Sequence, residues 1–274
     1  MPVDRPPAPH DLLAFYVEAG VDCALDEVAA DRLAAPEPAS PPRPAPAAQQ
    51  PQPAAPAAPA LLPGHAAAPD VAIQSAREAA RTAATLEDLR ALMEGFDGCA
   101  LKVTASRLVF ADGNPRARVM FVGEAPGRDE DLQGLPFVGR SGQLLNRMMA
   151  AIGLSRDSAY ITNIIPWRPP GNRDPSPIET QICLPFIKRH IELVDPEVLV
   201  CLGKPSTQTL LNVTDGIVRT RGRWFDYDTG SRVIGAMPTF HPAYLLRQPV
   251  SKRQSWQDFR AIARRLAERA DGAQ

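Results

Sequence analysis

Glu124, Asn163 and His241 are the three side chains whose types and positions best suit chemistry on a bound ligand. Glu124 lies in a glycine-rich loop, GEAPGRDEDLQGLPFVGRSG (123–142), whose backbone can approach a ligand closely. A carboxylate there can act as a general base, although most loop glutamates are simply solvated. The loop has neither the GxGxxG nor the GK[ST] pattern, so nucleoside triphosphate chemistry has no support.

The rest of this loop carries an aromatic residue and a charged run. Phe137 is either an anchor in the core or a stacking platform, and the sequence leaves both open. We expect a solvated charged run on the loop rim at Asp129, Glu130 and Asp131.

Asn163 begins a second segment, NIIPWRPPGNRDPSP (163–177). Its amide can donate and accept along one edge, as reading a planar, amide-bearing base requires, or it can tie down the next loop. In the proline-stiffened loop that follows, Arg168, Asn172 and Arg173 suit contacts with phosphates.

His241 lies in the third segment, TFHPAYLLRQP (239–249), where Pro242 restricts the backbone. A histidine after a strand is a candidate proton donor, although a lone histidine is usually structural. An apolar knob follows and ends in Arg247. An exposed apolar wedge beside a cation is suited to entering a base stack while holding a phosphate.

Buried strands and helices alternate along the segment that positions these residues. We expect strands at 117–123, 159–165, 197–203 and 231–240, and helices at 142–153, 176–193, 206–211 and 255–270. A further helical stripe covers 71–96. The pattern predicts an α/β fold with three α/β/α layers and a central, mainly parallel four-stranded sheet. Sites in such sheets form at the carboxyl ends of the strands, where all three segments begin.

Composition divides the chain. Residues 34–70 hold 14 Ala and 12 Pro, which predicts a semi-rigid, disordered linker between a short acidic segment (1–33) and a domain over 71–274. Residues 1–100 carry 6 basic and 14 acidic side chains, and residues 101–274 carry 24 and 17. The basic second part favours a polyanionic ligand, although such a charge also fits a domain that is merely soluble.

The cysteines and the apolar runs bear on the compartment. Cys23, Cys99, Cys183 and Cys201 lie far apart with no CxxC pair, which is typical of reduced thiols. We find no secretory signal and no apolar run of membrane-spanning length, so we expect a cytoplasmic protein.

Taken in order, GEAPGxxED–GLPFVGxSGxLL, YITNxxxxRPPGNR and HPAYLLR resemble the motifs of the uracil-DNA glycosylase superfamily. The resemblance is strongest to the bacterial and archaeal family 4 type and covers about residues 86–266. It implies a monofunctional enzyme of base excision repair that flips uracil out of DNA and hydrolyses its N-glycosidic bond.

The resemblance also implies roles for individual residues. Phe137 would stack on the base, Asn163 would pair with its recognition edge and Ala125 would line the base site. His241 would donate to uracil O2, and Glu124 would orient or activate water. Six further residues would hold or enter the DNA: Arg168, Arg173, Tyr244, Leu245, Leu246 and Arg247.

The chain departs from family 4 in its cysteines. The family holds a four-iron cluster through four thiolates, but here Phe96 and Trp167 occupy two of the four positions. Cys99 and Cys183 remain as remnants, and we expect no cluster, no other metal and no cofactor.

Two alternatives stay open: a catalytically inactive DNA-binding module of the same fold, and a glycosylase for another damaged base. We expect a monomer that binds uracil-containing DNA and no membrane. Its N-terminal segment docks on the main domain, docks on a repair or replication partner, or has no role, and the sequence leaves these three open.

Overall fold

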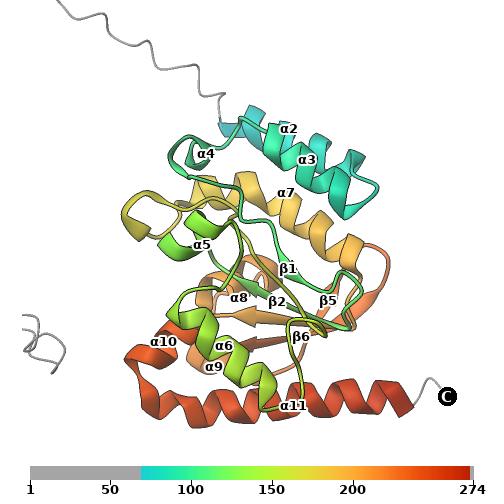
Figure 1. The fold of residues 1–274 in the computed structure, drawn as a ribbon. Helices are drawn as coiled ribbons and strands as arrows, with labels where there is room; N and C mark the ends of the chain where they lie inside the picture. Colours follow the sequence, from blue (N-terminus) through green and yellow to red (C-terminus); the bar gives the residue numbers. More distant parts are fainter. Residues whose placement is uncertain (1–68, 272–274) are drawn as a thin grey trace, which may run out of the picture. The chain divides into compact units, whose positions relative to one another are not determined.

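The structure, a computed structural model, describes residues 69–271. The predicted acidic segment 1–33 with Cys23, and all but the last two residues of the predicted linker 34–70, lie outside the described residues. Within the described part the chain forms a single sheet with helices on both of its faces (Figure 1).

Six strands form the sheet in the order β1-β3-β2-β4-β6-β5. The four central strands run parallel: β2 (Val119–Gly123), β3 (Tyr160–Asn163), β4 (Val198–Leu202) and β6 (Val233–Thr239). Two short antiparallel strands, β1 (Asp112–Gly113) and β5 (Phe225–Asp228), flank them at the edges. The predicted parallel four-stranded centre is confirmed, and the two edge strands were not predicted.

The strands bury alternate residues against different helices, because successive side chains point to opposite faces. Met120 and Val122 of β2 share an apolar cluster with the helices α2 (Pro69–Thr82), α3 (Leu86–Gly95), α7 (Pro177–Val194) and α8 (Lys204–Leu211). Val119 and Phe121 share the other cluster with α6 (Arg140–Ala150) and α11 (Lys252–Asp271). These two clusters make the three layers that the sequence predicts.

Short helices occupy the connections. These are α4 (Leu101–Thr104), α5 (Arg128–Gln133), α9 (Ile217–Thr220), α10 (Pro242–Arg247) and the 3-10 turns η1 (Pro170–Asn172) and η2 (Pro249–Ser251). In Figure 1, α5 and α10 lie at one edge of the layered body, together with the loop that leads into α7.

Capping boxes set two helix starts. Ser176 and Glu179 exchange the predicted pair of hydrogen bonds, of 3.2 and 2.7 Å, and α7 begins at Pro177. The stripe over 71–96 is two helices rather than one. Thr85 caps α3 by accepting from the Asp88 amide (3.1 Å), while its own amide donates to the Asp88 carboxylate (3.0 Å). No helix among residues 69–271 is long and apolar enough to cross a membrane.

Candidate active site

The carboxyl ends of the four parallel strands hold the three motif segments. Gly123 at the end of β2 pairs with Asn163 at the end of β3. The backbone pairing continues past both strands, because the Ile165 amide donates to the Glu124 carbonyl (2.9 Å). On the other side of β2, the Gly203 amide after β4 donates to the Thr239 carbonyl of β6 (2.8 Å), two residues before His241. The register of the strands therefore brings residues that are far apart in the sequence to one edge of the sheet.

Gly123 is the point at which the recognition side chains meet. A Cβ atom placed there would lie 2.3 Å from Asn163 Oδ1 and 2.6 Å from Phe137 Cζ, so both side chains pack directly on the glycine Cα. The Phe137 ring lies 5.5 Å from the His241 ring, centroid to centroid. His241 in turn packs against Gly203, where a Cβ atom would be 3.0 Å from that of the histidine. An amide, an aromatic ring and an imidazole thus share one small space.

Asn163 Oδ1 is buried, and it has no hydrogen-bond donor among the described residues. The side chain as a whole is 5% exposed. A buried acceptor without a partner costs free energy and is uncommon in folded proteins. Its placement beside Phe137 indicates a site that a hydrogen-bonding ligand completes.

His241 is held with its two ring nitrogens in different roles. It is the N-cap of α10, and its Nδ1 accepts from the Ala243 amide (3.1 Å). Because Nδ1 is an acceptor, the proton of the neutral ring lies on Nε2. Burial, together with the charge of Arg247, lowers the pKa of His241 to about 4. The ring is therefore a neutral donor at physiological pH.

Glu124 is half-buried at the start of the glycine-rich loop. No described residue donates a hydrogen bond to its carboxylate or forms an ion pair with it. Burial, and next the negative charge of Asp174, raise the pKa of the Glu124 carboxyl. An unpartnered carboxylate of raised pKa has the properties of a general base. Its neighbour Ala125 is half-buried and packs against the cluster beneath α7.

The predicted solvated run at 129–131 is wrong for two of its three members. Glu130 is 7% exposed and accepts from the amides of Gly127, Val138 and Gly139 at 2.9 to 3.1 Å. It thereby closes the glycine-rich loop on itself. Asp131 is 3% exposed and accepts from the Ser106 (2.8 Å) and Arg107 (3.3 Å) amides. The donors come from residues 3 to 25 positions away, which a local charge pattern does not reveal.

The two candidate phosphate-binding arginines already have partners in the protein. Arg168 donates from Nε to Asn172 Oδ1 (2.7 Å), and its Nη1 lies 4.0 Å from Asp131. Arg173 makes two hydrogen bonds of 2.9 and 2.6 Å with the carboxylate of Glu179, the residue that caps α7. A phosphate at Arg173 would share the guanidinium with this carboxylate.

The knob after His241 is a helix, α10, and its residues face different ways. Leu245 is 1% exposed and contributes to a small apolar hollow with α6 and α11, so it anchors α10 and is not at the surface. Leu246 is 38% exposed, Arg247 is exposed and Tyr244 is half-buried, with its ring 4.9 Å from that of Phe240. Side chains point in successive directions around a helix axis, so Leu245 points inward. The sequence motif, taken as one continuous apolar wedge, does not predict this.

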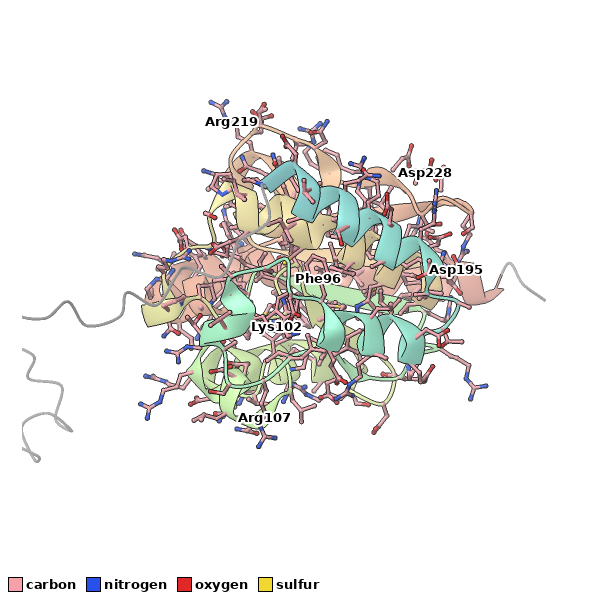
Figure 2. The ribbon with its side chains drawn as sticks, turned by 90° about the horizontal axis from the view of Figure 1, so that it is seen from above. Phe96, Lys102, Arg107, Asp195, Arg219 and Asp228 are labelled. Carbon is pink, nitrogen blue, oxygen red and sulfur yellow. The ribbon has the colours of Figure 1, made fainter. Side chains whose placement is uncertain are left out.

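The predicted cysteine remnants lie together in the helical layer. A hydrogen bond between the two thiols lowers the pKa of Cys99, and the same bond with burial raises that of Cys183. Phe96 (8% exposed, labelled in Figure 2) packs edge-on against Phe186 at 5.0 Å, and Trp167 is 2% exposed. Phe96 and Trp167, the residues that the resemblance places at two of the four thiolate positions, are therefore both buried aromatic rings.

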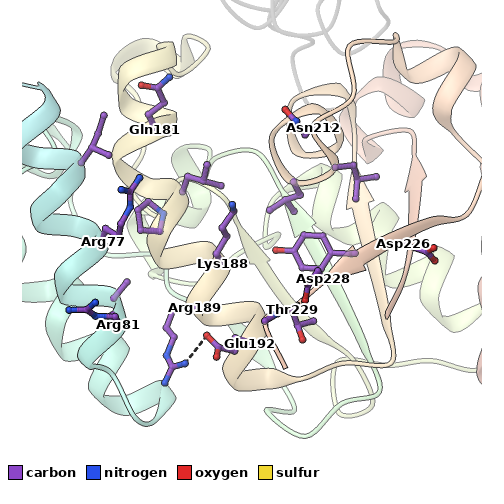
Figure 3. Close-up of a pocket in the computed structure, with 18 residues that line it drawn as sticks. Arg77, Arg81, Gln181, Lys188, Arg189, Glu192, Asn212, Asp226, Asp228 and Thr229 are labelled. Carbon is purple, nitrogen blue, oxygen red and sulfur yellow. Dashed lines mark hydrogen bonds and ion pairs between the residues drawn. The ribbon is translucent and has the colours of Figure 1, made fainter. Parts of the chain in front are cut away.

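A separate hollow lies away from the motif side chains. It has a volume of about 900 Å³ and is lined by residues of α2, α7, α8 and β5, among them Arg77, Arg81, Lys188 and Tyr227 (Figure 3). None of the motif side chains lines it.

Known proteins have sequences similar to this chain. The model of the uracil DNA glycosylase superfamily matches residues 110–260. The Type-4 uracil-DNA glycosylase of Archaeoglobus fulgidus is 39% identical over 182 residues, 65% of this chain and 92% of that protein. The protein of the same name from Thermotoga maritima is 41% identical over 150 residues, 54% and 77% of the two chains. That from Saccharolobus solfataricus is 38% identical over 174 residues, 62% and 81%.

Proposed function

Because the chain belongs to the uracil-DNA glycosylase superfamily, we propose that it hydrolyses the bond between uracil and deoxyribose in DNA, leaving an abasic site for base excision repair. The meeting of the Asn163 amide, the Phe137 ring and the His241 imidazole around Gly123 carries this proposal. A base inside the duplex cannot reach such a pocket, so the nucleotide must first be flipped out.

Phe137 and Asn163 recognise the base. The Phe137 ring stacks on one face of uracil. The unpartnered Oδ1 of Asn163 accepts from uracil N3–H, and its amide NH₂ donates to O4. Binding then satisfies the acceptor that is left without a partner in the free protein, which favours a base with this donor–acceptor edge over one without it.

His241 acts on the leaving base. As the C1′–N1 bond breaks, its electron pair passes to the uracil ring and negative charge gathers on O2. The proton on Nε2 of the neutral imidazole is available to O2 as a hydrogen bond. A preorganised donor of this kind contributes about 3 kcal/mol to transition-state stabilisation.

Glu124 acts on the other side of the bond. Its carboxylate orients the water that attacks C1′ and accepts the proton that the water loses. Its negative charge also stabilises the positive charge that develops on the sugar. Since only the ionised form does this, the raised pKa of Glu124 moves the acid limit of activity to a higher pH than an unperturbed carboxyl would give.

The DNA is held by residues around the site. Tyr244 and Leu246 of α10 enter the space that the flipped base leaves, and Arg247 holds the neighbouring phosphate, with Leu245 as the buried anchor beneath them. Arg168 and Arg173 contact phosphates from the loop after β3, and Ala125 lines the base site beside Glu124.

We also propose that the enzyme works without an iron–sulfur cluster or another cofactor. The buried rings of Phe96 and Trp167 support this, since they fill two of the positions where a cluster needs thiolates. We further propose that the protein is a cytoplasmic monomer and that residues 1–33, joined through the Ala/Pro-rich linker, are the segment available to a repair or replication partner.

The test is incubation of the purified full-length protein with an oligonucleotide that contains one uracil, followed by alkaline cleavage of abasic sites. Single- and double-stranded substrates are compared, with Glu124→Gln and His241→Asn as controls. We expect scission at the uracil for the wild type and far less for both variants. Binding without scission would favour an inactive DNA-binding module, and scission only at other damaged bases would favour the other alternative.

Iron content tests the cluster separately. We expect a colourless protein without stoichiometric iron when it is purified anaerobically. A broad visible absorption with about four irons per chain would overturn this part of the proposal.

A further inference from the structure

Phe137 has an unusual backbone conformation for an aromatic residue. Its φ is 55°, in the left-handed region. The other non-glycine residues with positive φ in the described part of the chain are Asn172, Asp195 and Asn212. Asn and Asp tolerate this region because their short polar side chains bond locally, whereas a bulky ring does not. Phe137 therefore needs its surroundings to hold it there.

Arg156 binds the backbone of this residue. Its guanidinium donates to the Phe137 carbonyl from Nη2 and to the Pro136 carbonyl from Nη1 (3.1 Å). The same group is ion-paired with Asp112 of β1, and its Nε donates to Asn146 of α6 (3.0 Å). Five donors in a fixed planar fork suit this arrangement, which links the loop to the sheet edge and to a helix.

Gly142 also contacts the Phe137 carbonyl. A Cβ atom at Gly142 would lie 1.7 Å from that oxygen, so the carbonyl packs on the backbone of the first turn of α6. The carbonyl of Phe137 is thus fixed against Arg156 and Gly142. Its ring, on the other side of the same residue, is presented to Gly123 and His241.

We propose that Arg156 is a positioning residue for base recognition: it fixes the Phe137 ring in its stacking orientation before DNA arrives. The inference rests on the proposed function and extends it to a residue outside the pocket. Without Arg156, the Phe137 backbone relaxes toward a common conformation, and the ring must be reordered whenever a base binds. Stacking on the base is equal in the ground state and the transition state, so the loss raises KM and leaves kcat unchanged.

The test compares Arg156→Gln with the wild type on an oligonucleotide that contains one uracil. We expect KM to rise about tenfold with kcat within about twofold, and Arg156→Lys to recover little, because an ammonium does not span both carbonyls and Asp112. Arg118→Gln is the matched control. Arg118 also pairs with a carboxylate and a carbonyl, those of Glu197 and Leu266, but it precedes β2, whereas the Phe137 ring packs on Gly123 at the other end of that strand. The Arg118→Gln variant is expected to leave KM unchanged.

A double-mutant cycle shows whether Arg156 acts through Phe137. In Phe137→Ala the ring is absent, so adding Arg156→Gln is expected to change kcat/KM no further. Additive losses in this cycle, a fall in kcat with unchanged KM, or a KM equal to that of Arg118→Gln would each overturn the proposal. Should Arg156→Gln not fold, Asp112→Asn replaces it, with a smaller rise in KM expected. A wild type without uracil excision would instead refute the proposed function.

Discussion

The two ends of the parallel strands use their polar groups in opposite ways. At the amino ends, Arg118 before β2 makes two hydrogen bonds of 2.7 and 2.8 Å with Glu197 before β4, and a third of 2.7 Å with the Leu266 carbonyl. Arg232 before β6 pairs with Asp195 at 2.7 Å; Figure 2 shows Asp195 at this end of the molecule. These pairs tie the starts of neighbouring strands together.

At the carboxyl ends, two polar groups of the candidate site are left incomplete. Asn163 Oδ1 has no donor within residues 69–271, and Glu124 has no hydrogen-bond or ion-pair partner there. The environment of His241 lowers its pKa to about 4. The contrast teaches that the amino ends serve stability, whereas the carboxyl ends hold groups in environments that cost free energy until a ligand binds.

The largest expected effect comes from removing the reacting groups at the carboxyl ends. Glu124→Gln and His241→Asn are each expected to lower kcat by about two to three orders of magnitude. Neither should lower the melting temperature appreciably, since Glu124 has no described partner and Asn can still cap α10. Single-turnover excision and thermal unfolding measure both quantities. Equal losses of stability and activity would contradict the division between the two ends.

Asn163→Leu should make the protein more stable and the enzyme less active. Removing the unpartnered acceptor is expected to raise the free energy of unfolding by about 1 kcal/mol and to lower kcat/KM by about 100-fold. Thr162→Val, one residue earlier, is the control, because its hydroxyl donates to the Phe110 carbonyl (2.6 Å). It should lower stability by about 1 kcal/mol. Urea unfolding of both variants checks this, and a destabilised Asn163→Leu would count against a ligand-completed acceptor.

His190 is a second buried histidine, and we propose no catalytic role for it. His190 is 2% exposed, stacks on Phe110 at 4.4 Å and shares a hydrogen bond with the Tyr160 hydroxyl (2.9 Å). Burial lowers its pKa to about 3, below the 6.5 of the unfolded chain. Its contribution to stability is thus complete above pH 6.5 and is lost as the pH falls toward 3, by at most about 1.4 kcal/mol per pH unit.

His190→Gln should flatten this part of the pH dependence. Urea unfolding at pH 7, 6, 5 and 4 compares the variant with the wild type, and His241→Asn shows how much the second histidine adds. Parallel curves for wild type and His190→Gln would mean that His190 takes up no proton on unfolding.

The smallest effect is expected at the amino ends. Arg118→Gln should lower the free energy of unfolding by about 0.5 to 1 kcal/mol, because the pair with Glu197 is partly exposed to solvent. Excision should stay within about twofold of the wild type. The stability difference should shrink in 1 M salt, which screens exposed charges, and a difference insensitive to salt would point to packing instead.

The sequence could predict the parallel centre of the fold because its signals are local. Each central strand is a continuous apolar run, and Ser176 with Glu179 marks the start of α7 within four residues. β1 and β5 have two and four residues with few buried side chains, so no periodicity develops. The break between α2 and α3 depends on Thr85, whose side chain caps α3. The apolar stripe continues through this break, so the sequence pattern does not reveal it.

The candidate site was predictable only in part for the same reason. Glu124, Asn163 and His241 each follow a recognisable strand, so their common edge could be predicted. Glu130 and Arg156 bind backbone groups of distant residues, and backbone groups carry no sequence signal. Their roles could be found only from coordinates.

His241 is at once the N-cap residue of α10 and the residue that we propose as donor to the leaving base. Any displacement of α10 toward the DNA therefore carries the imidazole with it. The connection is made by the chain itself and by three amides of α10: that of Ala243 donates to His241 Nδ1, and those of Tyr244 and Leu245 donate to the His241 carbonyl (2.9 and 3.3 Å). We therefore expect insertion of α10 into DNA and hydrogen bonding to the leaving base to be coupled.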